Sequence, residues 1–277
     1  MELMDIERVE IVKGPQGSLF GRGSAIGALS IISKKAEFDT LGEASAGIGS
    51  SEYKMASGMF NTPLVSDKLA LRVSARYRYR EGFHENSVPG APERLTGLNT
   101  IAARTALRWK PSDDLTVDFT YQFQRDRPAA TEFKSLVTPP AGGDLDPFTF
   151  TAQDRRDAKI YRRVHHLSLQ ADWQASDSIS VTSITGYRDV TALEKWDGDG
   201  TALPVIIGDQ DTNQNQFSQE LRANAELGEN ITLIAGASYF REEADDLIRF
   251  GTNEQYFAGG FPFTRRVPAI PAGGALL

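Results

Sequence analysis

The chain of 277 residues contains no cysteine, so it has no disulfide framework, no thiol nucleophile and no thiolate metal site. It also lacks any apolar run of about 18 residues, which excludes a membrane-spanning helix. Basic residues number 30 against 37 acidic ones, and the net charge is -7. An acidic chain without a basic cluster is a poor nucleic-acid binder, so we expect no nucleic-acid partner.

Residues suited to catalysis are also scarce. The chain has three histidines, and the adjacent pair His165-His166 opens an expected strand, so the two rings point to opposite faces. The acidic stretch at residues 197–200 lacks the later carboxylate of a calcium loop and is interpreted as a turn. No catalytic triad, carboxylate pair or zinc motif fits the layout. We therefore expect no enzyme activity, no cofactor and no metal site.

What the chain does have is a repeated strand pattern after residue 40. Residues 69–80 show it best, because odd positions are apolar and end in Tyr77 and Tyr79, while even positions are polar or cationic. This alternation predicts a strand with one apolar face. Eight further segments are expected to be strands: residues 41–49, 53–61, 99–110, 115–124, 164–174, 179–192, 216–226 and 231–243.

The connections between these strands alternate in length. Short ones lie at residues 63–67, 111–114, 175–178 and 227–230. Long ones are expected at residues 81–97, 125–162 and 194–213, followed by a loop-like tail from 244 to 277. Strands of about ten residues with alternating short turns and long loops are typical of an outer-membrane β-barrel. Six aromatic residues sit near the expected strand ends, where membrane interfaces favour them: Tyr77, Tyr79, Trp109, Trp173, Tyr187 and Tyr239.

A soluble β-sandwich would show the same alternation, because it also has one apolar and one polar face. A soluble, β-rich carbohydrate-binding module is therefore the alternative. The two differ in where the apolar face lies: exposed on a single sheet in a barrel, but packed on a second sheet in a sandwich. The mean hydropathy of -0.34 does not decide between them, because only alternate barrel residues face lipid.

The first segment differs from the rest. Residues 6–13 form an expected strand that ends at the Gly14-Pro15 turn, and a β-branched strand at 26–32 runs into Lys34 and Lys35. The glycines between them have the wrong spacing for a dinucleotide fingerprint, and no βαβ unit follows. We expect them to serve tight turns with positive φ.

This segment resembles the end of the plug domain of TonB-dependent outer-membrane receptors. The match runs almost without interruption from Ile6 to Gly21. Three positions depart from the usual pattern: Lys13 replaces arginine, Ala28 a glycine and Ser30 an asparagine. The residues that carry the plug motif are Glu7, Arg8, Glu10, Lys13, Gly14, Pro15, Gly21 and Gly27.

The resemblance implies an all-β fold, namely a fragment of a plugged transmembrane antiparallel β-barrel. About nine barrel strands would form an open curved sheet. Residues 1–38 would be the C-terminal part of the plug domain, and residues 39–277 the incomplete N-terminal part of the barrel. Met1 to Met4 lack the charged start and apolar core of a signal peptide, so we expect the signal and the TonB-contacting segment to lie outside this chain.

The resemblance also implies a function in the cell outer membrane of a Gram-negative bacterium. Such a receptor takes up a scarce ligand, most often a ferric siderophore, with energy from the TonB complex. Its partners would be TonB, outer-membrane lipid and the small ligand. In this family the basic residue before the Gly-Pro turn meets an acid of the barrel wall. Lys13 holds that position, and Glu220 on an inward face is its candidate partner. The alternatives are Asp118, Asp172 or an acid in barrel strands outside this chain.

Overall fold

The computed structural model describes residues 2–15, 26–134, 146, 148–155, 157–201, 205–228 and 230–252. Every regular element in these ranges is a β-strand. None of the described residues belongs to a helix long and apolar enough to cross a membrane.

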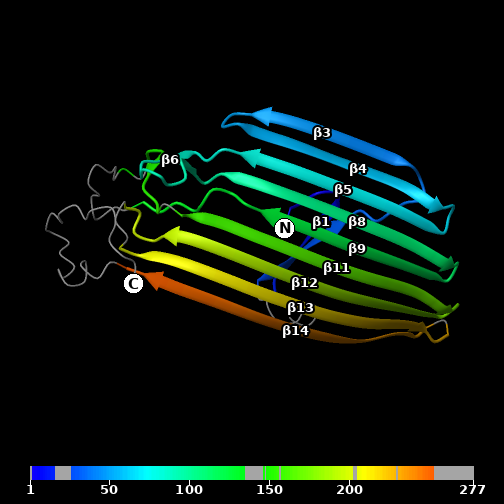
Figure 1. The fold of residues 1–277 in the computed structure, drawn as a ribbon. Coiled ribbons are helices and arrows are strands. Elements are labelled where there is room, and N and C mark those ends of the chain that lie inside the picture. Colours follow the sequence, from blue (N-terminus) through cyan, green and yellow to red (C-terminus); the bar gives the residue numbers. More distant parts are fainter. Residues whose placement is uncertain are drawn as a thin grey trace.

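The strands fall into three sheets (Figure 1). The first sheet is the pair β1 (Ile6–Lys13) and β2 (Gly27–Ser33). The second is small and contains β6 (His84–Asn86), β7 (Arg94–Leu95) and β10 (Thr151–Ala152). The main sheet has nine strands: β3 (Leu41–Gly49), β4 (Tyr53–Val65), β5 (Leu69–Arg80), β8 (Leu98–Ser112), β9 (Leu115–Asp126), β11 (Lys159–Ser176), β12 (Ile179–Asp197), β13 (Ile207–Glu226) and β14 (Thr232–Gly251).

The main sheet is a simple meander. Each of its strands pairs antiparallel with the next one along the chain, from β3 at one edge to β14 at the other. In the ranges that the structure describes, the two edge strands do not pair with each other, so the sheet stays open. The predicted nine-stranded open meander is confirmed.

The predicted strand lengths were too short at the end with the long connections. Residues 194–213 were expected to be a loop, but β12 continues to Asp197 and β13 begins at Ile207. The tail was expected to begin at Ala244, yet β14 runs to Gly251, and β11 begins at Lys159 rather than Val164. These extensions mix polar and apolar residues on both faces, so they lack the period-two signal that marks a half-buried strand.

The small sheet occupies connections that were expected to be loops only. β6 pairs with β7 antiparallel and with β10 parallel, next to a cluster of four fully buried side chains: Leu95, Ala130, Ala152 and Ala158. A Cβ at Gly82 would lie 1.9 Å from the carbonyl oxygen of Leu95, so only glycine fits there. Strands of two or three residues are too short to show a sequence period.

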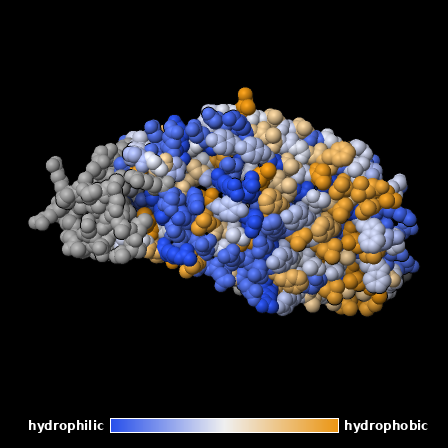
Figure 2. Space-filling view, in the orientation of Figure 1, coloured by the Kyte–Doolittle hydropathy of each residue, from blue (hydrophilic) through white to orange (hydrophobic). Residues whose placement is uncertain are grey.

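The apolar face of the main sheet is exposed. Several large side chains at odd positions of neighbouring strands are 38–50% accessible, for example Trp109, Trp173, Tyr187 and Phe217. Figure 2 shows hydrophobic residues gathered on this face toward the end with the short turns. In the described part of the chain no second sheet covers them. The face is thus that of a barrel rather than of a sandwich.

The upper edge of this apolar band is taken, on each strand, at the large outward-facing residue after which the outward face first carries a charged residue, a histidine or an asparagine on the way to the long connections. Its members are Tyr79 on β5, Ile101 on β8, Phe123 on β9, Leu167 on β11, Tyr187 on β12, Phe217 on β13 and Tyr239 on β14. Single large side chains return further along the outward face, at Tyr161, Leu193, Ile207 and Leu247.

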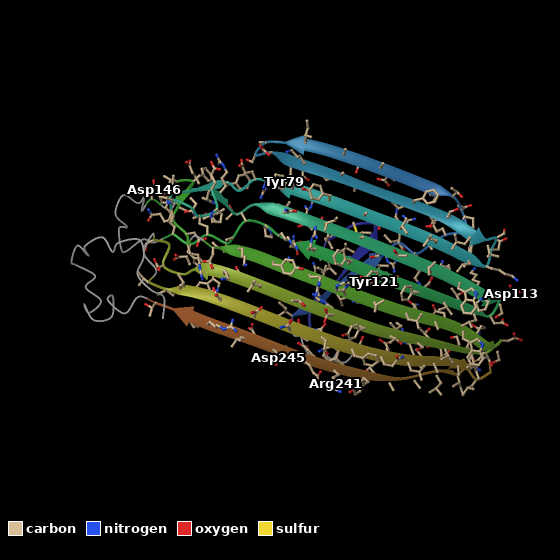
Figure 3. All side chains as sticks on the ribbon, in the orientation of Figure 1. Tyr79, Asp113, Tyr121, Asp146, Arg241 and Asp245 are labelled. Carbon is tan, nitrogen blue, oxygen red and sulfur yellow. The ribbon has the colours of Figure 1, made fainter. Side chains whose placement is uncertain are left out.

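The upper edge crosses the strands obliquely. Strand pairing places Val73, Tyr121 and Arg241 at one level. Tyr79 lies six residues above that level on β5, whereas Tyr239 lies two residues below it on β14. Figure 3 shows Tyr79 near the end of its strand and Tyr121 near the middle of β9. A drop of eight residues over six strand spacings corresponds to a strand tilt of about 43°, within the roughly 35–45° of transmembrane barrels.

Candidate functional site

The β1–β2 pair owes its shape to two glycines. Gly14 has φ of +85°, and its N–H donates to the carbonyl oxygen of Ile26 at 3.2 Å, which closes the end of the pair. Gly27 pairs with Lys13, and a Cβ there would lie 2.5 Å from the carbonyl oxygen of Val12. Gly27 also has a positive φ, of +152°, so both positions favour glycine. Gly27 belongs to β2 rather than to a tight turn, and the predicted turn glycines Gly21 and Gly23 lie outside the described residues.

The other motif residues are mostly turned to the surface. Glu7, Arg8 and Glu10 are exposed, and Arg8 forms its ion pairs with these two glutamates. Pro15 is exposed as well, and Gly21 lies outside the described residues. The contacts that hold this segment to the main sheet come instead from residues on either side of the pair.

Asp5 is the centre of these contacts. Its carboxylate accepts from Nε of Arg72 at 2.7 Å and from Nη1 of Arg104 at 3.2 Å. Arg104 also donates to the carbonyl oxygen of Lys34 at 2.7 Å, so it binds the residue before β1 and the residue after β2, which lie side by side at one end of the pair. The side chains of Asp5, Arg72 and Arg104 are only 7%, 2% and 4% exposed. Asp5 has φ of +53°, and Lys34 donates its N–H to the Asp5 carbonyl at 3.0 Å.

Glu2 makes a second set of contacts toward the long connections. Its carboxylate pairs with Nη2 of Arg78 at 2.6 Å and with Nη1 of Arg76 at 3.5 Å. Its backbone N–H donates to Oε1 of Gln124 at 2.5 Å. Arg76 donates to the carbonyl oxygen of Leu3 at 2.8 Å. Residues 2–5 therefore lie along the inward face of β5, β8 and β9.

A third set follows β2. Lys35 pairs with Asp118 of β9 at 2.8 Å, and Arg108 of β8 binds the same carboxylate with two hydrogen bonds of 2.8 and 3.0 Å. Asn61 of β4 is fully buried, receives the N–H of Glu37 and donates to the carbonyl oxygens of Glu37 and Asp39. The linker to β3 is thus fixed to the same face of the sheet.

These three sets define what we call the plug latch: Glu2, Asp5, Lys34, Lys35 and their partners Arg72, Arg76, Arg78, Arg104, Arg108, Asp118 and Gln124. The inward face of β5 and β8 is strongly cationic, and carboxylates from the N-terminal segment neutralise it. Buried charges need such partners, because an unpaired charge in a dry interior is costly. The latch makes the docking of the segment depend on a few specific ion pairs.

Glu220, the candidate partner of Lys13, lies on the inward face of β13. Its side chain is 43% exposed and pairs with Arg222 on the same strand. Lys13 is the last residue of β1 and is also exposed. Asp118, an alternative partner, binds Lys35 instead. The pairing of Lys13 with Glu220 remains a prediction.

We expect Lys13→Glu in the complete receptor to loosen the plug and raise passive permeability, and Glu220→Lys to restore it in part. The reason is that the change reverses one charge of the pair and the second change restores complementarity. An exposed pair contributes only about 0–1 kcal/mol, so the effect should be small. A double-mutant cycle on antibiotic permeability measures the coupling, and additive single effects would show that the two residues do not pair.

The acidic stretch at residues 197–200 is a turn held by its own backbone. Asp197 Oδ1 accepts the N–H groups of Asp199 and Gly200, each at 3.1 Å, and Asp199 Oδ2 accepts that of Ile206 at 2.7 Å. Nearby Asp154 is 1% exposed, and burial raises its pKa to about 6. Within the described ranges, no group of three or more His, Asp or Glu side chains is arranged to hold a metal ion.

The curated proteins that resemble this chain are receptors and transporters. No protein-family model matches the chain. It is 25% identical over 255 residues to the ferrioxamine B receptor of Salmonella typhimurium, covering 84% of this chain and 34% of that protein. It is 26% identical over 250 residues to the vitamin B12 transporter BtuB of Vibrio vulnificus, covering 87% and 35%. The chain thus spans about a third of the length of these relatives.

Solved structures agree on the fold. The ferric yersiniabactin uptake receptor FyuA from Yersinia pestis superposes with a TM-score of 0.72 at 18% identity, over 90% of this chain and 38% of that one. The ferripyoverdine receptor of the Pseudomonas aeruginosa outer membrane gives 0.69 at 15% identity, over 87% and 33%.

The open antiparallel sheet therefore has the fold of a fragment of an outer-membrane receptor barrel. The homologues and structural neighbours are TonB-dependent receptors of the Gram-negative outer membrane, and they are transport receptors rather than enzymes. Several of them are receptors for siderophores, as the names of the ferrioxamine, yersiniabactin and pyoverdine proteins state. The predicted family resemblance is confirmed.

Proposed function

We propose that this chain is part of an outer-membrane receptor that takes up a scarce ligand, most specifically a ferric siderophore, with energy from the TonB complex. Residues 1–38 would be the end of the plug, and residues 39–277 the first part of the barrel. The observation that carries the proposal is the arrangement of the two sheets. A strand pair is held by buried ion pairs on the polar inward face of an open sheet whose outward face is apolar.

The partners follow from this arrangement. The apolar outward band is suited to contact with outer-membrane lipid, because only a fully paired barrel satisfies its backbone groups there. The TonB contact would lie outside these 277 residues. The contrast with a carbohydrate-binding module is clear, because such a module would pack its apolar face on a second sheet. We infer no enzyme activity, since the latch carboxylates are engaged with arginines and no catalytic pair is present among the described residues.

The ligand would meet the inward face of the extended strands above the latch. There Gln210 donates to Asp246 at 3.0 and 3.1 Å. Trp196 packs edge-on against Phe250, with ring centroids 5.8 Å apart, and lies 6.0 Å from the ring of Phe133. A surface that combines aromatic rings with a few polar groups is suited to a small polar ligand.

The test is iron transport by the complete receptor in a Gram-negative host that lacks its own siderophore receptors. Cells would be given radioactive iron as its complex with ferrioxamine B, yersiniabactin or pyoverdine. We expect uptake of at least one complex, and its loss in an otherwise identical host without TonB. Uptake of none, although the receptor is in the outer membrane, would refute the siderophore assignment. Glycan binding by a soluble monomer would favour the carbohydrate-binding alternative.

A further inference from the structure

Two arginines lie directly opposite each other on the outward face of the main sheet. Arg125 of β9 and Arg163 of β11 are Cα partners in the ladder. Both stand at odd positions, on the same face as Phe123 and His165. Like charges placed directly opposite on neighbouring strands destabilise a sheet unless something neutralises them.

The surrounding described residues do not supply that neutralisation. Asp126, next to Arg125, faces inward and pairs with Arg162 at 2.8 Å. The outward-facing Asp189 lies opposite His165 in the ladder and forms no ion pair with either arginine. His165 itself is hydrogen-bonded to the hydroxyl of Tyr121 at 2.8 Å.

A third guanidinium extends the same patch. Arg127 follows β9 and lies over the ring of Tyr161, 5.1 Å from its centroid. Tyr161 is the next outward-facing residue of β11 beyond Arg163. Outward-facing arginines elsewhere have carboxylate partners: on β14, Arg241 pairs with Glu243, and Arg249 lies 3.8 Å from Asp211. The patch on β9 and β11 is thus cationic without its own counter-charge.

The three arginines lie just above the upper edge of the apolar band. Phe123 marks the upper edge of the apolar band on β9, and Arg125 is the next outward-facing residue. With the strand tilt derived above, two residues correspond to a rise of about 5 Å along the membrane normal. The guanidinium groups therefore lie just beyond the hydrocarbon, where the headgroups of the outer leaflet are found.

We propose that Arg125, Arg127 and Arg163 form a binding site for the phosphate groups of an anionic lipid in the outer leaflet. The proposal rests on the membrane location given under the proposed function. A guanidinium group presents paired N–H donors that match two phosphate oxygens. One phosphate between Arg125 and Arg163 would satisfy both groups and remove their mutual repulsion.

The test uses the complete receptor in detergent micelles, titrated with lipid A that carries its two phosphates and, separately, with the phosphate-free lipid. Native mass spectrometry measures how much lipid is retained. We expect Arg125→Gln/Arg163→Gln to weaken retention of the phosphorylated lipid about tenfold or more, because two charge-assisted contacts are lost. Arg241→Gln/Arg249→Gln is the matched control, since it removes two outward arginines that have carboxylate partners, and should change retention less than about twofold.

Arg163→Glu provides a variant that keeps the fold. It creates an opposite-charge pair with Arg125, so the thermal stability of the receptor in neutral detergent should be unchanged or higher. Retention of phosphorylated lipid should nevertheless fall at least as far as in the double glutamine variant. Competition with inorganic phosphate distinguishes the source of the anion, and equal competition by free phosphate would overturn a lipid site.

Equal retention by the wild type and the Arg125/Arg163 variants, or equal loss in the Arg241/Arg249 control, would also overturn the proposal. Outer-membrane fractionation of the same proteins is measured in parallel. A receptor that inserts but shows no arginine-dependent lipid binding refutes only this site. A receptor absent from the outer membrane refutes the proposed function itself.

Discussion

Asp5→Asn in the complete receptor is expected to weaken docking of the plug segment by about 3–5 kcal/mol, the cost of leaving a buried charge without its partner. The substitution keeps the size of the side chain but removes its charge. Arg72 and Arg104 would then face each other in a nearly solvent-free site, because both are under 5% exposed. The Lys34 carbonyl would remain as the acceptor for Arg104 only.

Urea titration with limited proteolysis of the plug measures this effect, and entry of a large antibiotic into cells measures its consequence. Glu52→Gln is the control, because the pair of Glu52 with Lys54 is about 60% exposed on both sides. That variant should behave like the wild type. A plug that opens at the same urea concentration in both variants would show that the Asp5 ion pairs do not hold it.

Leu169→Arg is expected to lower the free energy of unfolding in lipid by about 1–3 kcal/mol, between the roughly 2–4 kcal/mol of an arginine at the bilayer midplane and the roughly 0–1 kcal/mol near the interface. Leu169 faces outward on β11, between Trp173 near the short turns and Leu167 at the upper edge of the band. It is 43% exposed, so the loss would come from contact with hydrocarbon rather than from a cavity.

Gln170→Arg is the matched control, since it introduces the same side chain one residue further along the same strand. Gln170 faces inward and donates to Asp172 at 2.8 Å, in a polar environment that can accept a cation. Unfolding in urea from lipid vesicles should show a large loss for the first variant and little for the second. Similar losses for both, or none for either, would contradict the assignment of the two faces.

The nine barrel strands could be predicted because each contains a stretch with one face in an apolar environment and the other in a polar one. Alternation is strongest where the membrane band crosses the strand, as in β5 from Leu69 to Tyr79. The same physics explains the errors. Beyond Tyr187 on β12 and Tyr239 on β14 polar residues lie on both faces, and the apolar ones among them, such as Leu193, Trp196 and Phe250, are divided between the two faces. The sequence therefore looks like a loop although the ladder continues.

The greater length of the strands also changes the interpretation of the aromatic residues that were expected at strand ends. Tyr187 and Tyr239 were expected near strand ends, but β12 continues for ten residues beyond Tyr187 and β14 for twelve beyond Tyr239. They mark the level of the membrane interface and not the end of the strand. Trp109 and Trp173 lie near the short turns, as expected.

The plug latch was the part that the sequence did not reveal. The motif drew attention to Lys13 and Gly14, whereas the buried contacts come from Glu2, Asp5 and Lys35. No sequence motif marks those residues, because acids and lysines are common near strand ends. A usable signal did exist, since two carboxylates lie within the first five residues and the polar face of β5 carries four arginines. Charge complementarity between separate segments could have linked them.

The order of the latch contacts along the chain has a mechanical consequence. Glu2 and Asp5 follow one another on a single segment and form ion pairs with different residues of β5. Glu2 pairs with Arg78 and Asp5 pairs with Arg72. A force applied N-terminal to Glu2 would load these ion pairs one after another, so the segment would peel rather than shear. The force needed for such stepwise release is the force that breaks one ion pair, and not the force that breaks all of them together. Because Arg104 binds both Asp5 and the Lys34 carbonyl, rupture at Asp5 would also weaken the contact of the residue that follows β2 at the same end of the strand pair.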